Sequence, residues 1–289
     1  MSRIVGSLGM GLALALLLAP APGGTAAERD ASTPPAAVAG VPEGELSGRE
    51  IYRRLLLNRF RTSLQHLTIV AVEPDGHQQE VQMLARWKDY RDEHGQPQDG
   101  VIAKSVVRFL EPFDMRRTTY LVVARDDRTH DQYFYSKHTK RVRRILLRGV
   151  GILGTDYTLD DLVFHGIDDA EYERLPDDQV SGVATYVVRA RMRPELETRY
   201  PLTTTYIDQE RYVPLRTLYH DADGVLLREL LSNVESIEEF DGVWIATAST
   251  MRDVRDDTSS TMVVHLLRPN PELDEALFNN FRLREFSWQ

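Results

Sequence analysis

The chain has 289 residues, of which 42% are hydrophobic and 27% charged, enough material for one large domain or two small ones. Its formal net charge of -9 argues against a general electrostatic hold on nucleic acid. The chain contains no cysteine, which excludes disulfide frameworks, thiolate metal sites, cysteine nucleophiles and a lipidated N-terminal cysteine.

The N-terminus has the features of a secretory signal peptide. Residues 4–19 form an apolar run, which follows Arg3 and precedes a proline and the small residues Thr25-Ala26-Ala27. A basic residue, an apolar stretch and a small-residue cleavage site in this order predict a signal peptide over residues 1–27. The alternative is a membrane anchor, but the run is shorter than the roughly 20 residues that span a bilayer. We therefore expect export, and the lack of cysteine favours the oxidising periplasm of a Gram-negative bacterium.

The rest of the chain divides into a short leader and one domain. Residues 28–47 are rich in Ala, Pro and Gly and predict a flexible leader, whereas residues 48–289 show no internal repeat and no linker. Ser47 and Glu50 have the spacing of a capping box, because each side chain can satisfy a free amide at a helix start. Apolar residues then recur at helical spacing, so we expect a helix over 48–61.

After this helix the hydrophobic period changes to two, which predicts strands. Val81, Met83, Ala85 and Trp87 alternate with polar residues, including Arg86, and similar runs follow to the C-terminus. The pattern over Val101–Phe109 is blurred by Ile102 and Val106. Short turns at 74–76, 221–224 and 241–242 connect neighbouring strands as hairpins. We expect roughly a dozen antiparallel strands, with further helical segments only at Leu159–Phe164 and Pro271–Asn279.

Motifs for catalysis or cofactor binding are weak. Gly149-Val-Gly151-Ile-Leu-Gly154 matches a dinucleotide-binding pattern but lacks the flanking strand and helix, so we expect a glycine loop. The eight histidines lack metal-site spacing, and no G-x-S-x-G nucleophile motif is present. Acidic pairs such as Asp160-Asp161 lie in turn-like sequence and are expected to be solvated. The sequence predicts no enzyme activity, no metal site and no cofactor.

A basic run stands out in this acidic chain. It contains Lys137, His138, Lys140, Arg141, Arg143 and Arg144. One interpretation is a solvated edge strand, because basic side chains discourage edge-to-edge aggregation. The other is a local site for a lipid headgroup or an acidic partner. Strand alternation places Arg141 and Arg143 on one face and Arg144 on the other, so an arginine directed inward would need a carboxylate or phosphate.

Several elements in order resemble the LolA-like outer-membrane lipoprotein-sorting protein family. They are Pro112-Phe-Asp114-Met-Arg116, Tyr133-Phe-Tyr135, Arg141-Val-Arg143-Arg144-Ile145 and Gly154-Thr-Asp156-Tyr157-Thr-Leu-Asp160-Asp161-Leu162, with Tyr206-Ile-Asp208 and Tyr212-Val-Pro214 further on. The resemblance covers about residues 45–285. Arg117 departs from it, because the family usually has glycine there and arginine tolerates a positive φ poorly.

The resemblance implies a mainly β fold, namely a half-open, strongly curved antiparallel β-barrel with a few helices covering its concave face. It also implies a periplasmic carrier or chaperone that binds lipid or lipoprotein acyl chains in a hydrophobic cavity. An inner-membrane transporter of the RND/MMPL type is an implied partner, and we expect a monomer that does not bind nucleic acid.

We expect the alternating strands to supply the hydrophobic lining. The candidates are Val81, Met83, Trp87, Val107, Phe109, Tyr186, Val188 and Met192, with Arg141, Arg143 and Arg144 near a headgroup or docking partner. An ordinary packed core is an equal alternative, since a sequence pattern does not distinguish a filled barrel from an empty one. Two other functions remain open: a regulatory binding module of the same fold that docks on a membrane signalling protein, and an exported hydrolase.

Overall fold

The computed structural model describes residues 45–126, 130–145, 151–158, 161, 166–194 and 198–285. The chain separates into two units, Met1–Gly40 and Val41–Gln289. The expected signal peptide and most of the expected leader lie outside the described residues. Within the described ranges, none of the helices has the length and apolar composition that crossing a membrane requires.

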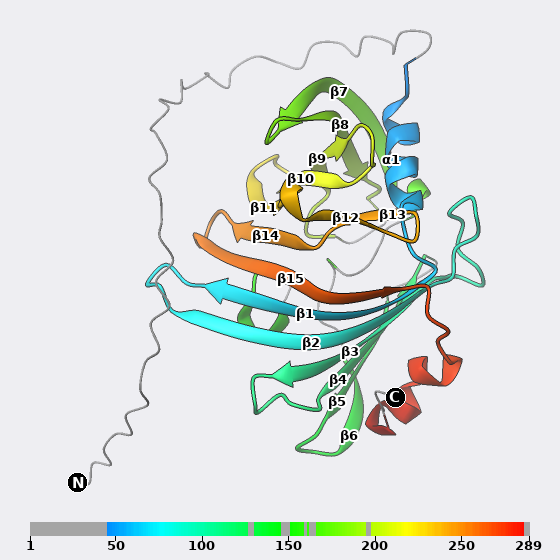
Figure 1. Ribbon diagram of the computed structural model, residues 1–289, viewed down its shortest axis with the longest axis vertical. Coiled ribbons are helices and arrows are strands. Elements are labelled where there is room, and N and C mark those ends of the chain that lie inside the picture. The colour runs from blue at the N-terminus through cyan, green and yellow to red at the C-terminus, as the bar shows by residue number, and fades with distance from the viewer. Residues whose placement is uncertain are drawn as a thin grey trace. The chain divides into compact units, whose positions relative to one another are not determined.

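The second unit consists of strands with one α-helix and several short 3-10 helices among the described residues (Figure 1). The helices are α1 (Gly48–Leu57), η1 (Ile152–Gly154), η3 (Ile167–Asp169), η4 (Val234–Ser236), η5 (Glu275–Phe278) and η6 (Asn280–Glu285). The strands of the first half are β1 (Thr62–Val72), β2 (Gln78–Asp89), β3 (Val101–Glu111), β4 (Thr119–Arg125), β5 (Asp131–Ser136) and β6 (Arg141–Ile145). Those of the second half are β7 (Ala170–Val180), β8 (Val183–Met192), β9 (Leu202–Asp208), β10 (Pro214–His220), β11 (Leu226–Ser232), β12 (Ile237–Phe240), β13 (Val243–Ala246), β14 (Ala248–Asp253) and β15 (Thr258–Pro269).

Thirteen of these strands form one continuous sheet in the order β6-β5-β4-β3-β2-β1-β15-β14-β11-β10-β9-β8-β7. Every pairing between the described strands is antiparallel, and β12 and β13 form a separate hairpin. The sheet curves strongly but does not close, because β6 and β7 remain its two edges (Figure 1). This confirms the mainly β, half-open barrel expected from the sequence. It also contradicts a dinucleotide-binding fold, which requires parallel strands.

The sequence predicts the start of α1 correctly but not its end. Ser47 caps α1 by accepting a hydrogen bond from the Glu50 amide, but the Glu50 carboxylate pairs with Arg53 and Arg54 instead of completing the box. The helix ends at Leu57, earlier than the expected residue 61, because the chain must turn into β1 at Thr62. The three expected hairpin turns are present. Within the expected C-terminal helix, only η5 forms.

One face of the sheet can be followed across both halves by its cross-strand pairs, since directly opposed residues point to the same side. We call this the inner face. The pairs run Val188–Thr205, Thr205–Thr217, Thr217–Leu230, Leu230–Met251, Met251–Ser260 and Ser260–Ala71, and then continue from Ile69 to Val81. Among the described residues, two elements cover this face, namely α1 at the β7–β9 end and residues 151–158 near the middle.

The helix α1 packs directly on the sheet. Ile51 is fully buried against Val188 and Ile207, with the ring of Tyr52 4.6 Å from that of Tyr172. A Cβ added at Gly48 would lie 2.7 Å from the Arg174 backbone nitrogen, so only glycine permits this approach of the helix start to β7. The apolar stripe predicted for this helix therefore serves to cover one end of the inner face.

The opposite, outer face is also covered where η5 and η6 cross β3–β6. Phe278 and Leu283 are buried there against Val106 and Leu121. Both sides of β3 are consequently apolar at Val106, which explains part of its blurred alternation, whereas Ile102 lies at a register shift and packs in a separate cluster with Ala103 and Ala124. Arg86, expected on a wet face, is instead buried opposite Val106, and burial lowers the pKa of its guanidinium.

Candidate functional site

Residues 151–158 cross the middle of the inner face and place two apolar side chains on it. Ile152 and Tyr157 are each at most 5% exposed and pack with residues of β1–β4, including Met83 and Phe109. Met251, from the other half of the sheet, joins the same cluster. These residues therefore close the apolar centre of the inner face, and we call residues 151–158 together with Asp161 the inner cover.

A tight loop gives the inner cover its shape. The Ile152 amide donates to the Tyr157 carbonyl over 2.7 Å, and Gly151 pairs with Thr158. A Cβ at Gly151 would lie 2.1 Å from the Thr155 carbonyl oxygen, so this position requires glycine. Leu153 has φ 49°, a left-handed conformation that non-glycine residues adopt at a cost.

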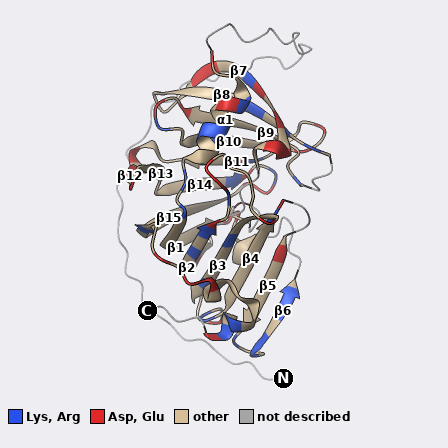
Figure 2. Cartoon of the chain, turned by 90° about the vertical axis from the view of Figure 1, so that its right-hand side faces the viewer, with Lys and Arg blue, Asp and Glu red and all other residues tan. Residues whose placement is uncertain are grey.

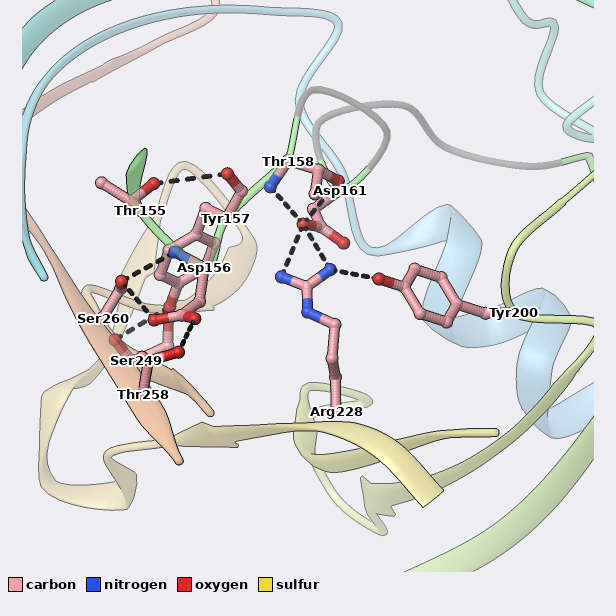
Figure 3. Close-up of polar contacts among 10 residues, drawn as sticks. All are labelled: Thr155, Asp156, Tyr157, Thr158, Asp161, Tyr200, Arg228, Ser249, Thr258 and Ser260. Carbon is pink, nitrogen blue, oxygen red and sulfur yellow. Dashed lines mark hydrogen bonds and ion pairs between the residues drawn. The ribbon is translucent and has the colours of Figure 1, made fainter. Parts of the chain in front are cut away.

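The first anchor of the inner cover is Asp156. Its carboxylate accepts hydrogen bonds from the hydroxyls of Thr258 and Ser260, each at 2.6 Å, and its amide donates to the Ser260 hydroxyl over 2.8 Å (Figure 3). Both partners lie on β15. The neighbouring Tyr157 donates its hydroxyl to the Ser249 carbonyl over 3.0 Å, on β14, and burial raises the pKa of Tyr157.

The second anchor is a buried ion pair. The Asp161 carboxylate accepts from the Thr158 amide and hydroxyl and from the guanidinium of Arg228, which lies 3.3 Å away on β11 (Figure 3). The Arg228 side chain is 2% exposed and also donates to the Tyr200 hydroxyl over 2.8 Å. Asp161 was expected to be solvated, and this expectation is wrong, because its carboxylate neutralises a buried arginine.

Electrostatics keep this pair charged. Burial acts to lower the pKa of the Arg228 guanidinium, but the charge of Asp161 and the contact with Tyr200 outweigh it, so the pKa is raised. A buried ion pair of this kind contributes little net stability, since both groups lose their hydration. It does fix where the inner cover sits, because a displaced Asp161 would leave Arg228 without its carboxylate.

The expected lining residues share the inner face but not one site. Val81, Met83, Val107 and Phe109 pack under the inner cover, whereas Trp87 belongs to a small cluster with Ala103 and Ala124. Tyr186 and Val188 pack under α1, and Met192 is half-buried at the end of β8. The inner face is thus apolar in two patches, one beneath each cover.

The three arginines of the basic run do not converge. They lie on β6, an edge strand, where the lysine and arginine positions are blue in Figure 2. Arg143 opposes Phe134 on the inner face, whereas Arg144 opposes Tyr133 on the outer face and pairs with Asp131 at 2.7 Å. Arg141 and Arg143 therefore border the inner face, and Arg144 faces away from it.

The departure at Arg117 has a visible consequence. Arg117 has φ 69°, in the left-handed region that glycine adopts freely, in the turn between β3 and β4. In the same turn Phe113 is 72% exposed, with Arg116 and Lys137 over its ring at 5.3 and 5.8 Å. The backbone shape that the family's glycine would allow is thus kept here by an arginine.

Sequence reasoning missed the partners that hold the inner cover. Arg228, Ser249, Thr258 and Ser260 lie at least 67 residues from the anchors they contact, Tyr200 reaches the site only through Arg228, and none of them belongs to a recognisable motif. One signal was available: Arg228 shares a strand face with Leu226 and Leu230, where a third apolar residue would be usual. The anchors Asp156 and Tyr157 were noted only as parts of a family resemblance, and Asp161 also as part of an acidic pair expected to be solvated.

Comparison with known proteins defines the fold. A family model described as "Uncharacterized protein" matches residues 102–285, and no curated protein sequence matches the chain. An outer membrane lipoprotein-sorting protein domain from Vibrio parahaemolyticus has a similar structure, with a TM-score of 0.73 and 21% identity, covering 82% of this chain and 98% of that one. A DUF1329 family protein from Desulfovibrio piger aligns with a TM-score of 0.74 and 19% identity, covering 82% and 97%. The LolA superfamily protein NE2245 from Nitrosomonas europaea aligns with a TM-score of 0.63 and 16% identity, covering 81% and 98%. These likenesses establish a LolA-like fold.

Proposed function

Because the chain belongs to the family whose model matches residues 102–285 and has the LolA-like fold, we propose that it is a periplasmic carrier for lipid or lipoprotein acyl chains. The acyl chain binds on the inner face beneath the inner cover. The observation that carries the proposal is the continuous apolar patch of Val81, Met83, Val107 and Phe109 under a segment held by discrete polar anchors.

The energies allow an acyl chain to replace the inner cover. Burying one methylene group stabilises by about 0.8 kcal/mol, so ten methylenes gain about 8 kcal/mol. Lifting the cover exposes Ile152 and Tyr157, at about 1.5–3 kcal/mol for each side chain. It also separates Asp161 from Arg228, at about 3–5 kcal/mol if Arg228 stays buried without a partner. The free energy gained by burying the acyl chain is comparable to the free energy lost by lifting the inner cover, so the ligand can be both loaded and released.

The charged groups at the sheet edge suit the polar end of such a ligand. Arg141 and Arg143 border the inner face, where an acyl chain lying across β1–β4 would present its headgroup. Binding there combines an apolar channel with cationic groups at its mouth. Release to an acceptor, such as an inner-membrane transporter of the RND/MMPL type, would require the inner cover to reclose behind the departing chain.

A reversible lock on the inner cover tests this proposal. The chain has no cysteine, so Asp156→Cys with Ser260→Cys creates a single cysteine pair at two residues already in contact. Binding of a fluorescent C16 fatty acid is then measured on the same protein before and after oxidation. We expect the reduced form to bind and the oxidised form to lose at least about tenfold in affinity.

The reduced double variant is the matched control, since it differs only by the crosslink. Far-UV circular dichroism of the oxidised form verifies that the sheet is intact. Equal affinity in both redox states would refute entry beneath the inner cover. Native mass spectrometry of the gently purified unaltered chain complements this test, and the absence of any bound amphiphile in several preparations would count against a carrier.

A further inference from the structure

A hollow lies on the outer face, away from the inner cover. Its volume is about 280 Å³, and it opens between the β5–β6 edge and η6. Tyr133 and Tyr135 form its floor, because they alternate on β5 and both point to the outer face. The ring of Phe281, which is 78% exposed, forms part of the rim. We call this hollow the outer cleft.

Among the residues that the structure describes, three cations line the outer cleft and no acidic residue does. They are Lys140 from the β5–β6 turn, Arg144 from β6 and Arg284 from η6. Arg144 also pairs with Asp131, and Arg284 has Glu285 at 3.5 Å, both outside the lining. Lys140 forms no ion pair with any residue that the structure describes. The cleft therefore has an excess of positive charge in a chain with a net charge of -9.

The floor offers unused hydrogen-bonding groups. In the described ranges, neither the Tyr133 nor the Tyr135 hydroxyl makes a hydrogen bond, although other tyrosines of the sheet do, such as Tyr120 to Gln132 at 2.7 Å. An aromatic floor with an exposed phenylalanine at the rim favours a flat apolar body. The hydroxyls and the three cations favour an acidic group attached to that body.

We propose that the outer cleft binds a small amphiphilic anion, in which a carboxylate, phosphate or sulfonate is joined to a flat apolar body. The volume lies at the lower end of the range for ligand pockets, which suits a small molecule better than a two-chain lipid. The cleft opens on the outer face, whereas the acyl chain of the proposed function lies on the inner face. The two sites are therefore occupied independently.

A charge-reversal experiment with a matched control tests this second site. The probe is 1-anilinonaphthalene-8-sulfonate, which joins a sulfonate to a flat apolar body, and its affinity is measured by fluorescence titration. Lys140→Glu with Arg284→Glu changes two cations of the cleft. The edge-strand control, Arg189→Glu with Arg191→Glu, changes two cations on β8, beside the other edge strand β7 and away from both proposed sites.

We expect the cleft double variant to lose about tenfold in affinity for the probe and the edge-strand control to stay within twofold. Phe281→Ala should weaken binding of the probe about threefold, because the variant loses apolar contact with the ring system of the probe. The affinity of the neutral analogue N-phenyl-1-naphthylamine should be the same in both charge-reversal variants as in the unaltered chain. Unchanged affinity in the cleft variant, or an equal loss in the edge-strand control, would overturn the proposal. Because the fatty-acid assay uses the inner face, its result does not decide this one.

Discussion

The inner cover and the pair η5 and η6, which we call the outer cover, are built in contrasting ways. The inner cover contributes Ile152 and Tyr157 to the apolar cluster and is positioned by buried polar contacts at Asp156 and Asp161. The outer cover, η5 and η6, contributes Phe278 and Leu283 and has its main ionic contact, at Glu275, half-exposed. Buried hydrogen bonds and an ion pair thus position the inner cover, whereas apolar packing holds the outer cover.

This difference indicates different roles. Apolar burial is non-directional and adds stability with area, so the outer cover is a permanent part of the fold. A buried ion pair adds little net stability but specifies one position, so it places the inner cover accurately. A segment that must open and reclose on a ligand needs this second combination.

Removing apolar packing from the outer cover should produce the largest effect. Phe278→Ala removes a ring that is 5% exposed and should lower the free energy of unfolding by about 3 kcal/mol, measured by chemical denaturation. Phe281→Ala, three residues away and 78% exposed, is the control and should change it by less than about 0.5 kcal/mol. Similar losses in both variants would mean that the outer cover is not held by burial.

Breaking the inner ion pair should have an intermediate and local effect. Asp161→Asn removes the charge that faces Arg228 and should cost about 2 kcal/mol, less than for a fully isolated charge because Tyr200 still contacts Arg228. Hydrogen exchange should accelerate in residues 151–158 before it does in β1 or β2. The exposed pair Arg252–Asp257 provides the control, and Asp257→Asn should change stability by less than about 0.5 kcal/mol. Uniform acceleration over the whole sheet would contradict a separately opening inner cover.

The ionic contact of the outer cover should show the smallest effect and a defined pH dependence. Partial burial alone would raise the pKa of Glu275, but hydrogen bonds from Lys88, Tyr90 and Lys104 outweigh it and lower the pKa to about 2, from an ordinary value of 4.5. Its stabilisation is therefore complete above about pH 4.5 and is lost as the pH falls toward 2. Solvent screens this half-exposed group, so Glu275→Gln should cost only about 1 kcal/mol at pH 7.

Chemical denaturation of the unaltered chain and of Glu275→Gln between pH 7 and pH 2.5 tests this pH dependence. The difference between the unaltered chain and the variant should shrink as the pH falls, because protonation removes the same charge that the substitution does. A difference that persists unchanged at low pH would assign the effect to packing and not to charge.

Part of the fold could be read from the sequence. Period-two alternation and short turns predicted the antiparallel hairpins, and Ser47 with Glu50 located the start of α1. The C-terminal limit of α1 was missed, because the apolar spacing continues to Phe60 although the chain turns there into β1. Arg86 and Asp161 were predicted to be solvated but are buried. A polar residue in an alternating or turn-like stretch is normally solvated, and these two are buried only because segments distant in the sequence cover them.

The sequence by itself determined the class of strands, their hairpin connections and the start of the helix, because these depend on residues near one another in the chain. Only the tertiary structure decided which faces are covered and by what. The contacts of Asp156 with Ser260, of Asp161 with Arg228 and of Phe278 with β3 join residues separated by 67 positions or more. Such contacts depend on how a thirteen-stranded sheet curves, and no local pattern records that curvature.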